Sequence, residues 1–407
     1  MELDVLGLFS ACSYALDCVE AELVHVTSKH AKRVAYMSVC VAEQMGIQGK
    51  ELQDLAVCAL LHDNALTQYI QEELHNDIAR ASAAQEFPRL GAHCSMGEHN
   101  IQGLPFHTDV TNVILYHHEN ADGTGPFGKK WEETPLFARI IHLCDLLDVA
   151  CRTQTFTTAT WEKGLDFLQK AKGRMFDAEC VNAFLKSFSE AHFLSLGSRD
   201  LDACLWNKVP RIRQELTFSQ IKVLADFFAH IVDYKWYICW CGYKNITWHG
   251  KYSAYTEKRG KYMLTENQIK LTIGSLLHDI GKVAVGNEIL EKPGRLTDEE
   301  FTTMKDHASY TYYILSEIDG FEELRDWAAF HHERLDGTGY PFGKTAADLN
   351  TQERMMACVD IYQALTESRP YKQGMSHEKA CGILKDMADK GWIDAEIVSQ
   401  VDSCFRI

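Results

Sequence analysis

The chain has 407 residues, of which 46% are hydrophobic and 24% charged, so it has the composition of an ordinary globular protein with room for two or three domains. Its formal net charge of −16 argues against a broad surface for DNA or RNA, but not against a small anionic ligand held by metal ions and a few basic residues. We find no secretory signal and no apolar run of the ~18 residues that a membrane helix needs. The expected location is therefore cytoplasmic, with no membrane partner.

The fourteen cysteines are scattered along the chain and include no Cys-x-x-Cys pair, so we expect them to stay reduced. Cys239 and Cys241 lie close together, but no second pair matches them. The cysteine spacing therefore predicts no structural zinc site.

Apolar residues recur three and four positions apart through the first half of the chain. Examples are Val34, Val39, Val41, Met45, Leu55, Val57, Leu60 and Leu61. This period is that of helices which bury one face around a core.

The same period continues between residues 153 and 215, whereas the aromatic and basic residues 236–262 show no clean pattern and allow no structural prediction. Further on, the sequences Thr265–Gln268 and Thr297–Glu300 are capping boxes, which predict a helix start at each. No segment alternates strongly enough to predict a strand. The predicted fold class is all-α.

The residues from His331 to Pro341 combine two adjacent imidazoles, two carboxylates and a glycine-rich turn. Neighbouring side chains on a helix point about 100° apart, so both imidazoles can face one cavity only where the helix end opens onto it. The glycines and Pro341 that follow are suited to such a helix-to-loop junction. We therefore expect a shared metal site there.

An earlier copy of this motif begins at His117 and lacks only the tyrosine. The pair His62-Asp63 matches His278-Asp279 in the same way. His93 matches His307, and Asp145 matches Asp360, with all these offsets between 214 and 216 residues. A repeat of this length indicates two duplicated domains, because the repeats of a solenoid are only ~20 to 50 residues long.

The candidate metal ligands are the imidazoles and carboxylates at these repeated positions. In the first copy they are His30, His62, Asp63, His93, His117, His118 and Asp145, and in the second they are His278, Asp279, His307, His331, His332 and Asp360. Such mixed sets suit iron, manganese or zinc. An aspartate that follows a histidine can bridge two ions, and two ions ~3.5 to 4 Å apart can activate water for attack on a phosphodiester.

With these motifs assembled, the second half resembles the HD-GYP domain, a subfamily of the HD phosphohydrolases. The resemblance covers roughly residues 265 to 400. It rests on the sequences His278–Lys282, Lys292–Thr297, Lys305–His307, His331–Pro341 and Asp360–Lys372. It implies two tandem helical HD-type domains: a divergent HD domain at residues 1–205, and an HD-GYP phosphodiesterase domain at residues 206–407.

The resemblance further implies metal-dependent hydrolysis of cyclic di-GMP or 3',3'-cyclic GMP-AMP in bacterial second-messenger signalling. The product would be the linear dinucleotide, with further cleavage to mononucleotides.

The resemblance also implies two divalent ions per centre, first iron or manganese and otherwise zinc, nickel or magnesium. Asp279 and Lys282 would be catalytic, and Lys282, Arg369 and Lys372 would bind the substrate. A second copy of the chain or a GGDEF-type protein is the expected protein partner.

Each copy departs from the family pattern at one place. The second copy has Ile246 where the first has His30, so His249 is its candidate for the additional metal ligand. The first copy has Leu66 at the position of Lys282, which favours a regulatory or dimerising role over catalysis there.

Two other hypotheses stay open at this point. A protein with degenerate centres would sense a nucleotide or a redox state through its metal without turnover. A di-iron oxygenase would use the same ligand types on dioxygen, although Lys282 and Arg369 speak against it.

Overall fold

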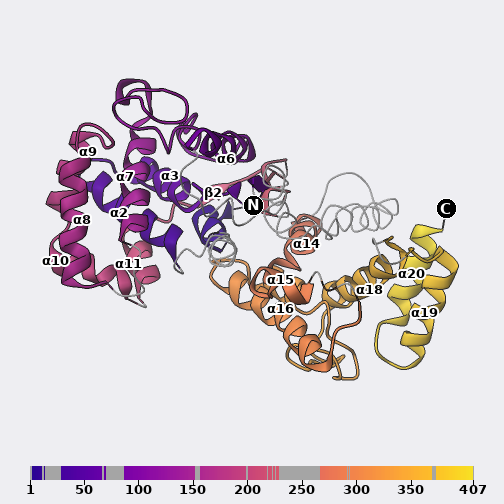
Figure 1. Ribbon diagram of the computed structural model, residues 1–407. Helices are drawn as coiled ribbons and strands as arrows, with labels where there is room; N and C mark the ends of the chain where they lie inside the picture. Colours follow the sequence, from indigo (N-terminus) through magenta and orange to yellow (C-terminus); the bar gives the residue numbers. More distant parts are fainter. Residues whose placement is uncertain are drawn as a thin grey trace. The chain divides into compact units, whose positions relative to one another are not determined.

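The computed structural model describes residues 2–11, 13, 29–66, 68–69, 87–151, 156–198, 200–217, 219–221, 223–224, 226–228, 266–290, 292, 294–368 and 373–406. These residues form two compact units, one up to residue 214 and one from residue 215 onward, which Figure 1 colours from indigo to magenta and from orange to yellow. The unpatterned segment of residues 236–262, with His249, lies outside the described residues. Thr265, Arg369 and Lys372 lie outside them as well.

The first unit is helical around a core built on α2. Its elements are β1 (Glu2–Leu3), α2 (His30–Gln44), α3 (Gly49–Leu60), α6 (Phe87–Asn100), η1 (Trp131–Glu133), α7 (Leu136–Ala150), α8 (Thr158–Ala171), α9 (Ala178–Ser187), α10 (Glu190–Leu194), η2 (Ser195–Gly197), α11 (Leu201–Lys208) and β2 (Gln214–Glu215). Helix α2 packs against α3, α7, α9 and α11. Its apolar residues Val34, Val39 and Val41 are fully buried, as their spacing predicts.

Helices α8 to α11 confirm the helical periodicity between residues 153 and 215. The pairing of β1 with β2 was not predicted, because strands of two residues are too short to show an alternating pattern. The prediction of an all-α fold is confirmed.

The second unit is also helical among its described residues. Its elements are α14 (Glu266–Leu277), η3 (Ile280–Ala284), α15 (Asn287–Leu290), α16 (Asp298–Ser316), α17 (Glu322–Ala329), α18 (Thr351–Thr366), α19 (His377–Asp389) and α20 (Ala395–Phe405). Helix α18 packs against α17, α19 and α20, and its residues Met356, Val359 and Tyr362 are buried in their shared core. The capping box at Thr297 starts α16 as predicted.

The segment before the first histidine pair is not a regular helix. In the second unit, helix α17 ends at Ala329, two residues before His331. In the first unit, residues 111–118 form successive turns instead. Asn112 has a left-handed φ of 66°, and the carboxylate of Glu98 accepts hydrogen bonds from the backbone N–H groups of Asn112 and Leu115. A side chain here takes the place of the helix carbonyls as the acceptor, so the turns need no continuous helix.

Within the described part of the chain, every helix is too short or too polar to cross a membrane.

Candidate metal centres

Equivalent elements bring the candidate ligands together in the two units. The His-Asp pairs begin within two residues of the ends of α3 and α14, and the next histidines come from α6 and α16. The adjacent histidines come from the turns before each glycine-rich loop, and the last aspartates come from α7 and α18. All thirteen candidate ligands among the described residues lie in one of two clusters, one per unit. The fourteenth, His249, lies outside the description.

Asp279 lies in the middle of the cluster in the second unit. Its Oδ2 is 3.3 Å from the Nε2 of His278, and its Oδ1 is 3.6 Å from the Nε2 of His307. Asp360 approaches the same nitrogen of His278 to 3.7 Å, and the Nε2 atoms of His307 and His331 are 3.5 Å apart. The two oxygens of Asp279 thus face two different groups of nitrogens, which is the arrangement of a carboxylate that bridges two ions.

Buried charges set the pKa values in this cluster. Burial alone would lower the pKa of His278, but the carboxylates of Asp279 and Asp360 outweigh it and raise the pKa to about 10. Burial lowers the pKa of His331 to about 3. Burial likewise lowers the pKa of His307 to about 4, against the attraction of Asp279. The cluster therefore mixes one imidazole that keeps its proton at neutral pH with neutral imidazoles.

Asp63 has the same central place in the first unit. Its Oδ2 is 3.5 Å from the Nε2 of His62, and its Oδ1 is 3.4 Å from the Nε2 of His93 and 3.6 Å from that of His117. Asp63 is therefore placed to bridge two ions, as Asp279 is.

Asp145 closes the other side of this cluster. Its Oδ1 is 3.4 Å from the Nε2 of His30 and 3.8 Å from that of His62, and its Oδ2 is 3.7 Å from the Nδ1 of His118. All seven candidate ligands of the first copy are thus assembled.

A carboxylate behind His30 was missed by the sequence analysis. Asp148 accepts a hydrogen bond from the Nδ1 of His30 at 2.8 Å. Arg33 holds Asp148 through two hydrogen bonds of 2.6 and 2.8 Å. Such a carboxylate orients a ligating imidazole and raises its basicity. The available signal was its place one helical turn after Asp145 on α7.

A buried glutamate holds the loop behind each pair of histidines. Glu333 accepts hydrogen bonds from the backbone N–H groups of Phe342 and Lys344 at 2.7 and 2.9 Å, and Glu119 makes the equivalent bonds in the first copy. A Cβ at Gly339 would collide with the backbone of Glu333. The glycine-rich loop is therefore closed directly against the histidine pair, as the motif predicts.

Tyr340, the residue missing from the first copy, packs against the ring of His332 with 4.7 Å between ring centroids.

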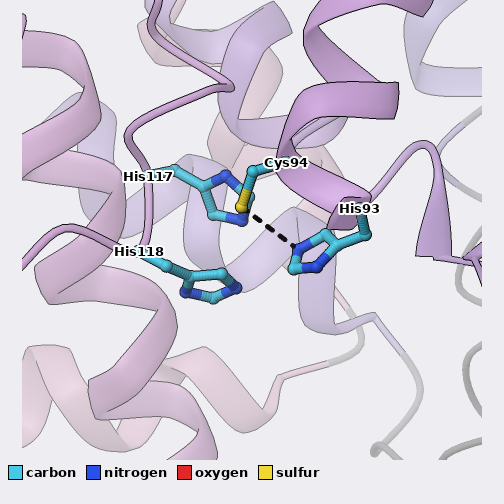
Figure 2. A group of neighbouring side chains, drawn as sticks. All are labelled: His93, Cys94, His117 and His118. Atoms are coloured by element: carbon cyan, nitrogen blue, oxygen red, sulfur yellow. Dashed lines mark hydrogen bonds between the residues drawn. The ribbon is translucent and has the colours of Figure 1, made fainter. Parts of the chain in front are cut away.

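Cys94 is a further residue that sequence reasoning missed. It follows His93 on α6, is fully buried, and its Sγ lies 3.7 Å from the Nε2 of His93. Figure 2 shows it between His93 and His117, with His118 beside them. Burial would raise the pKa of the Cys94 thiol, but the rings of His117 and His93 outweigh it and lower the pKa to about 6.

Both clusters fit divalent ions by the orientation of their imidazoles. The Nδ1–H groups of His278, His307 and His331 donate to backbone carbonyls three residues earlier, at 2.8, 2.6 and 2.6 Å. His62 and His117 make the same bond. The Nε2 of each ring therefore points into the cluster, where an ion can bind it in place of a proton, as in a metal-ligating histidine.

Buried polar atoms without a hydrogen-bond partner also favour metal binding. The Nε2 atoms of His62 and His117 and the Oδ1 of Asp63 have no hydrogen-bond partner among the described residues. Leaving buried polar atoms unpaired costs ~1 to 3 kcal/mol each, and a metal ion removes that cost by binding them. Two imidazoles on one ion have nitrogens ~3.3 Å apart, which is close to the 3.5 Å between His307 and His331.

An open cavity of about 130 Å³ lies beside the second cluster. It is lined by Asp279, Lys282, His332, Asp360, Gln363, Ala364 and Glu367. The Nζ of Lys282 lies 2.6 Å from the Oδ2 of Asp279, at the edge of this cavity. An ammonium group next to the central carboxylate can also form an ion pair with an anionic ligand that enters the cavity.

A model of the HD domain family matches residues 17–180 and 251–397 of the chain. The chain is 27% identical to 3'3'-cGAMP-specific phosphodiesterase 1 of Vibrio cholerae over 96% of its own length and 89% of that protein. It is 31% identical to 3'3'-cGAMP-specific phosphodiesterase 3 of the same bacterium, over 74% of its own length and 64% of that protein. The chain thus spans slightly less than two thirds of this second relative.

A solved structure of a cyclic GMP-AMP specific phosphodiesterase of Vibrio cholerae has the same fold. It matches with a TM-score of 0.67 and 24% sequence identity, and the match covers 100% of this chain and 98% of that one.

Proposed function

The chain belongs to the HD domain family, and from this premise we propose that its second unit is a cyclic-dinucleotide phosphodiesterase, a phosphoric diester hydrolase that depends on divalent metal ions. The single observation that carries the proposal is the position of Asp279. Its Oδ2 faces the Nε2 of His278 and its Oδ1 faces that of His307. Lys282 contacts the same carboxylate, which also lines the cavity.

The proposed metal ligands of this unit are the six described residues His278, Asp279, His307, His331, His332 and Asp360. When bound, the ions would lower the pKa of a water molecule to make it a nucleophile and would neutralise charge on the phosphodiester. The protein contributes orientation, because backbone carbonyls fix the rings of His278, His307 and His331 before any ion arrives.

Lys282 has the position of a phosphate-binding and leaving-group residue. Its ammonium lies 2.6 Å from Asp279, so a phosphodiester in the cavity would be within its reach as negative charge builds up on the departing oxygen. The cavity of about 130 Å³ is smaller than the ~300 to 1,000 Å³ of pockets that enclose a whole ligand. We infer that it accepts one phosphodiester group while the bases lie outside it. Arg369 and Lys372 stay the predicted further contacts of the substrate.

For the substrate, we place 3',3'-cyclic GMP-AMP ahead of cyclic di-GMP, because the two relatives that match most of the chain carry that substrate in their names. The product is the linear dinucleotide, with mononucleotides after a second cleavage, in bacterial second-messenger signalling. Two ions per centre, with iron or manganese first, stay a prediction, as do a homodimer or GGDEF-type partner and a cytoplasmic location.

Anaerobic turnover tests this proposal. Full-length protein loaded separately with iron(II) and manganese(II) is given cyclic di-GMP, cyclic di-AMP and 3',3'-cyclic GMP-AMP, and the products are separated by chromatography. We expect the linear dinucleotide from 3',3'-cyclic GMP-AMP, and no turnover in Asp279→Ala at an unchanged circular dichroism spectrum.

Metal-loaded protein that binds a nucleotide tightly but never cleaves it would select the sensor hypothesis instead. One sequence feature favours that outcome, since Ile246 stands where the first copy has the ligand His30.

A further inference from the structure

The sulfur of Cys94 lies inside the proposed metal cluster of the first unit. The candidate ligand atoms of His93, Cys94, His117 and His118 all lie within 4.8 Å of one another. Figure 2 shows that the thiol of Cys94 points toward the rings of His93 and His117 and not away from them. The four side chains come from α6 and from the turns before the glycine-rich loop, so the fold brings them together.

The separation of the ligand atoms matches that of two ligands on one ion. Bonds of ~2.3 Å to sulfur and ~2.0 to 2.1 Å to nitrogen put the two atoms ~3.5 Å apart in tetrahedral geometry. The Sγ of Cys94 lies 3.7 Å from the Nε2 of His93. That distance suits a hydrogen bond of the thiol, and it is also the separation of two ligands on one ion.

An independent observation also points to an ion. The Nε2 of His117 is buried and has no hydrogen-bond partner among the described residues, while its Nδ1–H is already donated to the carbonyl of Ile114 at 2.6 Å. The ring is therefore held with its Nε2 directed at the cluster, beside Cys94. The Oδ1 of Asp63, 3.6 Å from this nitrogen, is also without a hydrogen-bond partner there.

We propose that Cys94 is a thiolate ligand to an ion that His93, His117 and His118 also bind, and that this ion is zinc. As the sulfur–metal bond forms, the S–H bond breaks and its proton leaves to solvent. Thiolates favour zinc over manganese or magnesium, which prefer oxygen ligands. The second unit has Ala308 at the equivalent position, directly after His307, so its ligands are nitrogen and oxygen only.

The two centres of one chain would then select different metals. A zinc site with a thiolate and three imidazoles has four protein ligands, which is the closed set of a structural site. The centre in the second unit keeps an open side at its cavity. The inference does not depend on which cyclic dinucleotide is cleaved, or on whether any is.

Cobalt(II) substitution tests the sulfur ligand directly. Metal-free, full-length protein is kept under reducing and anaerobic conditions and titrated with Co²⁺ while its near-ultraviolet absorption is recorded. We expect a thiolate-to-cobalt charge-transfer band that is lost in Cys94→Ser and in Cys94→Ala. Cys40→Ala is the matched control, because Cys40 is a buried thiol of α2 beside Tyr36 and Lys208, and it should keep the band.

Zinc affinity provides a second measurement. Competition with a chromophoric chelator should show that Cys94→Ser weakens one zinc site by at least about tenfold, while manganese binding changes little. Circular dichroism and the melting temperature check that the variants fold.

A charge-transfer band that survives in both Cys94 variants overturns the proposal, and so does Co²⁺ uptake by the wild type without any such band. An equal loss of zinc and manganese affinity would mean that Cys94 acts by packing alone.

Discussion

Lys282 supplies a positive charge at a position where the first unit has the apolar Leu66. Its ammonium contacts Asp279 at 2.6 Å but adds no lone pair for a metal while it is protonated. Charge recognition and metal binding are therefore separable at this residue.

The variant Lys282→Met should lower kcat by about 10²- to 10³-fold, because one stabilising contact to the developing charge is lost. Its metal content should equal that of the wild type. Steady-state kinetics and elemental analysis of the same samples check both parts. Lys385→Met is the control, since Lys385 pairs with Asp402 at 2.9 Å, outside the cluster, and a comparable loss in that variant would refute the assignment.

Proton release on metal uptake follows from His278. Its pKa is raised to about 10 by Asp279 and Asp360 against burial, so at pH 7 to 8 the metal-free protein holds a proton that an ion must displace. Apparent affinity should therefore rise with pH, by up to about tenfold per unit for one proton, and level off above pH 10. Calorimetric titrations with Mn²⁺ in buffers of different ionisation enthalpy measure this release. A buffer-independent heat would contradict it.

The same raised pKa has a consequence for stability without metal. Because the folded-state pKa of His278 is above the unfolded value, its contribution is complete below pH ~6.5 and is lost as the pH rises through 10. His307 and His331 have lowered pKa values, so their contribution is complete above pH ~6.5 and is lost as the pH falls toward 4 and 3. The metal-free second unit should accordingly be most stable near neutral pH.

At the scale of elements, the close contact of η3 with α16 sets the distance between His278 and His307. Thr311 of α16 accepts a hydrogen bond from the N–H of Gly281 at 3.0 Å and donates one to the carbonyl of His278 at 2.9 Å. A Cβ at Gly281 would collide with the backbone of His307 and of Thr311. A glycine is therefore required where the two ligand-bearing elements meet.

The variant Gly281→Ala should lower the free energy of unfolding by about 1 to 3 kcal/mol and reduce the metal content, because η3 and α16 must move apart. Urea denaturation and elemental analysis test this expectation. Gly274→Ala is the matched control, since a Cβ at this position of α14 meets only ordinary contacts, with Leu324 and Trp327 of α17. That substitution should be neutral or should stabilise the helix by up to about 1 kcal/mol. Equal behaviour of the two variants would argue against the close contact.

At the scale of the whole molecule, the two units have kept different parts of one ancestral arrangement. The first has the candidate ligand His30 and the carboxylate of Asp148 hydrogen-bonded to it. The second has Ile246 and Gln363 at these positions, so both the imidazole and its orienting carboxylate are absent from its sequence. The second unit has Lys282 where the first has Leu66. The set of candidate metal ligands is thus more complete in the first unit, and the second has the lysine that we propose for substrate recognition.

Single-centre variants test this division of roles. Asp63→Ala should lower the metal content of the first unit, which keeps the zinc ligands proposed above, and should leave at least half of the cyclic-dinucleotide turnover. Asp279→Ala should abolish turnover and leave the first unit's metal in place. Elemental analysis beside kinetics measures both. Turnover lost only in Asp63→Ala would assign catalysis to the first unit.

The sequence alone determined the helical fold class, the duplication and the identity of the clustered residues. It could do so because a metal centre needs particular side chains at helix ends and in a glycine-rich loop, and a repeat at 214 to 216 residues shows the same requirement twice. His249, Arg369 and Lys372 stay predictions, as they lie outside the described residues.

Only the tertiary structure identified the contacts between helices that no motif specifies. Asp148 supports His30 because α7 packs on α2, and Cys94 faces His93 and His117 because of the orientation of α6. A thiol or carboxylate that acts across helices has no fixed spacing from its partner in the chain. Its role depends on packing, which brings residues together that are remote in sequence.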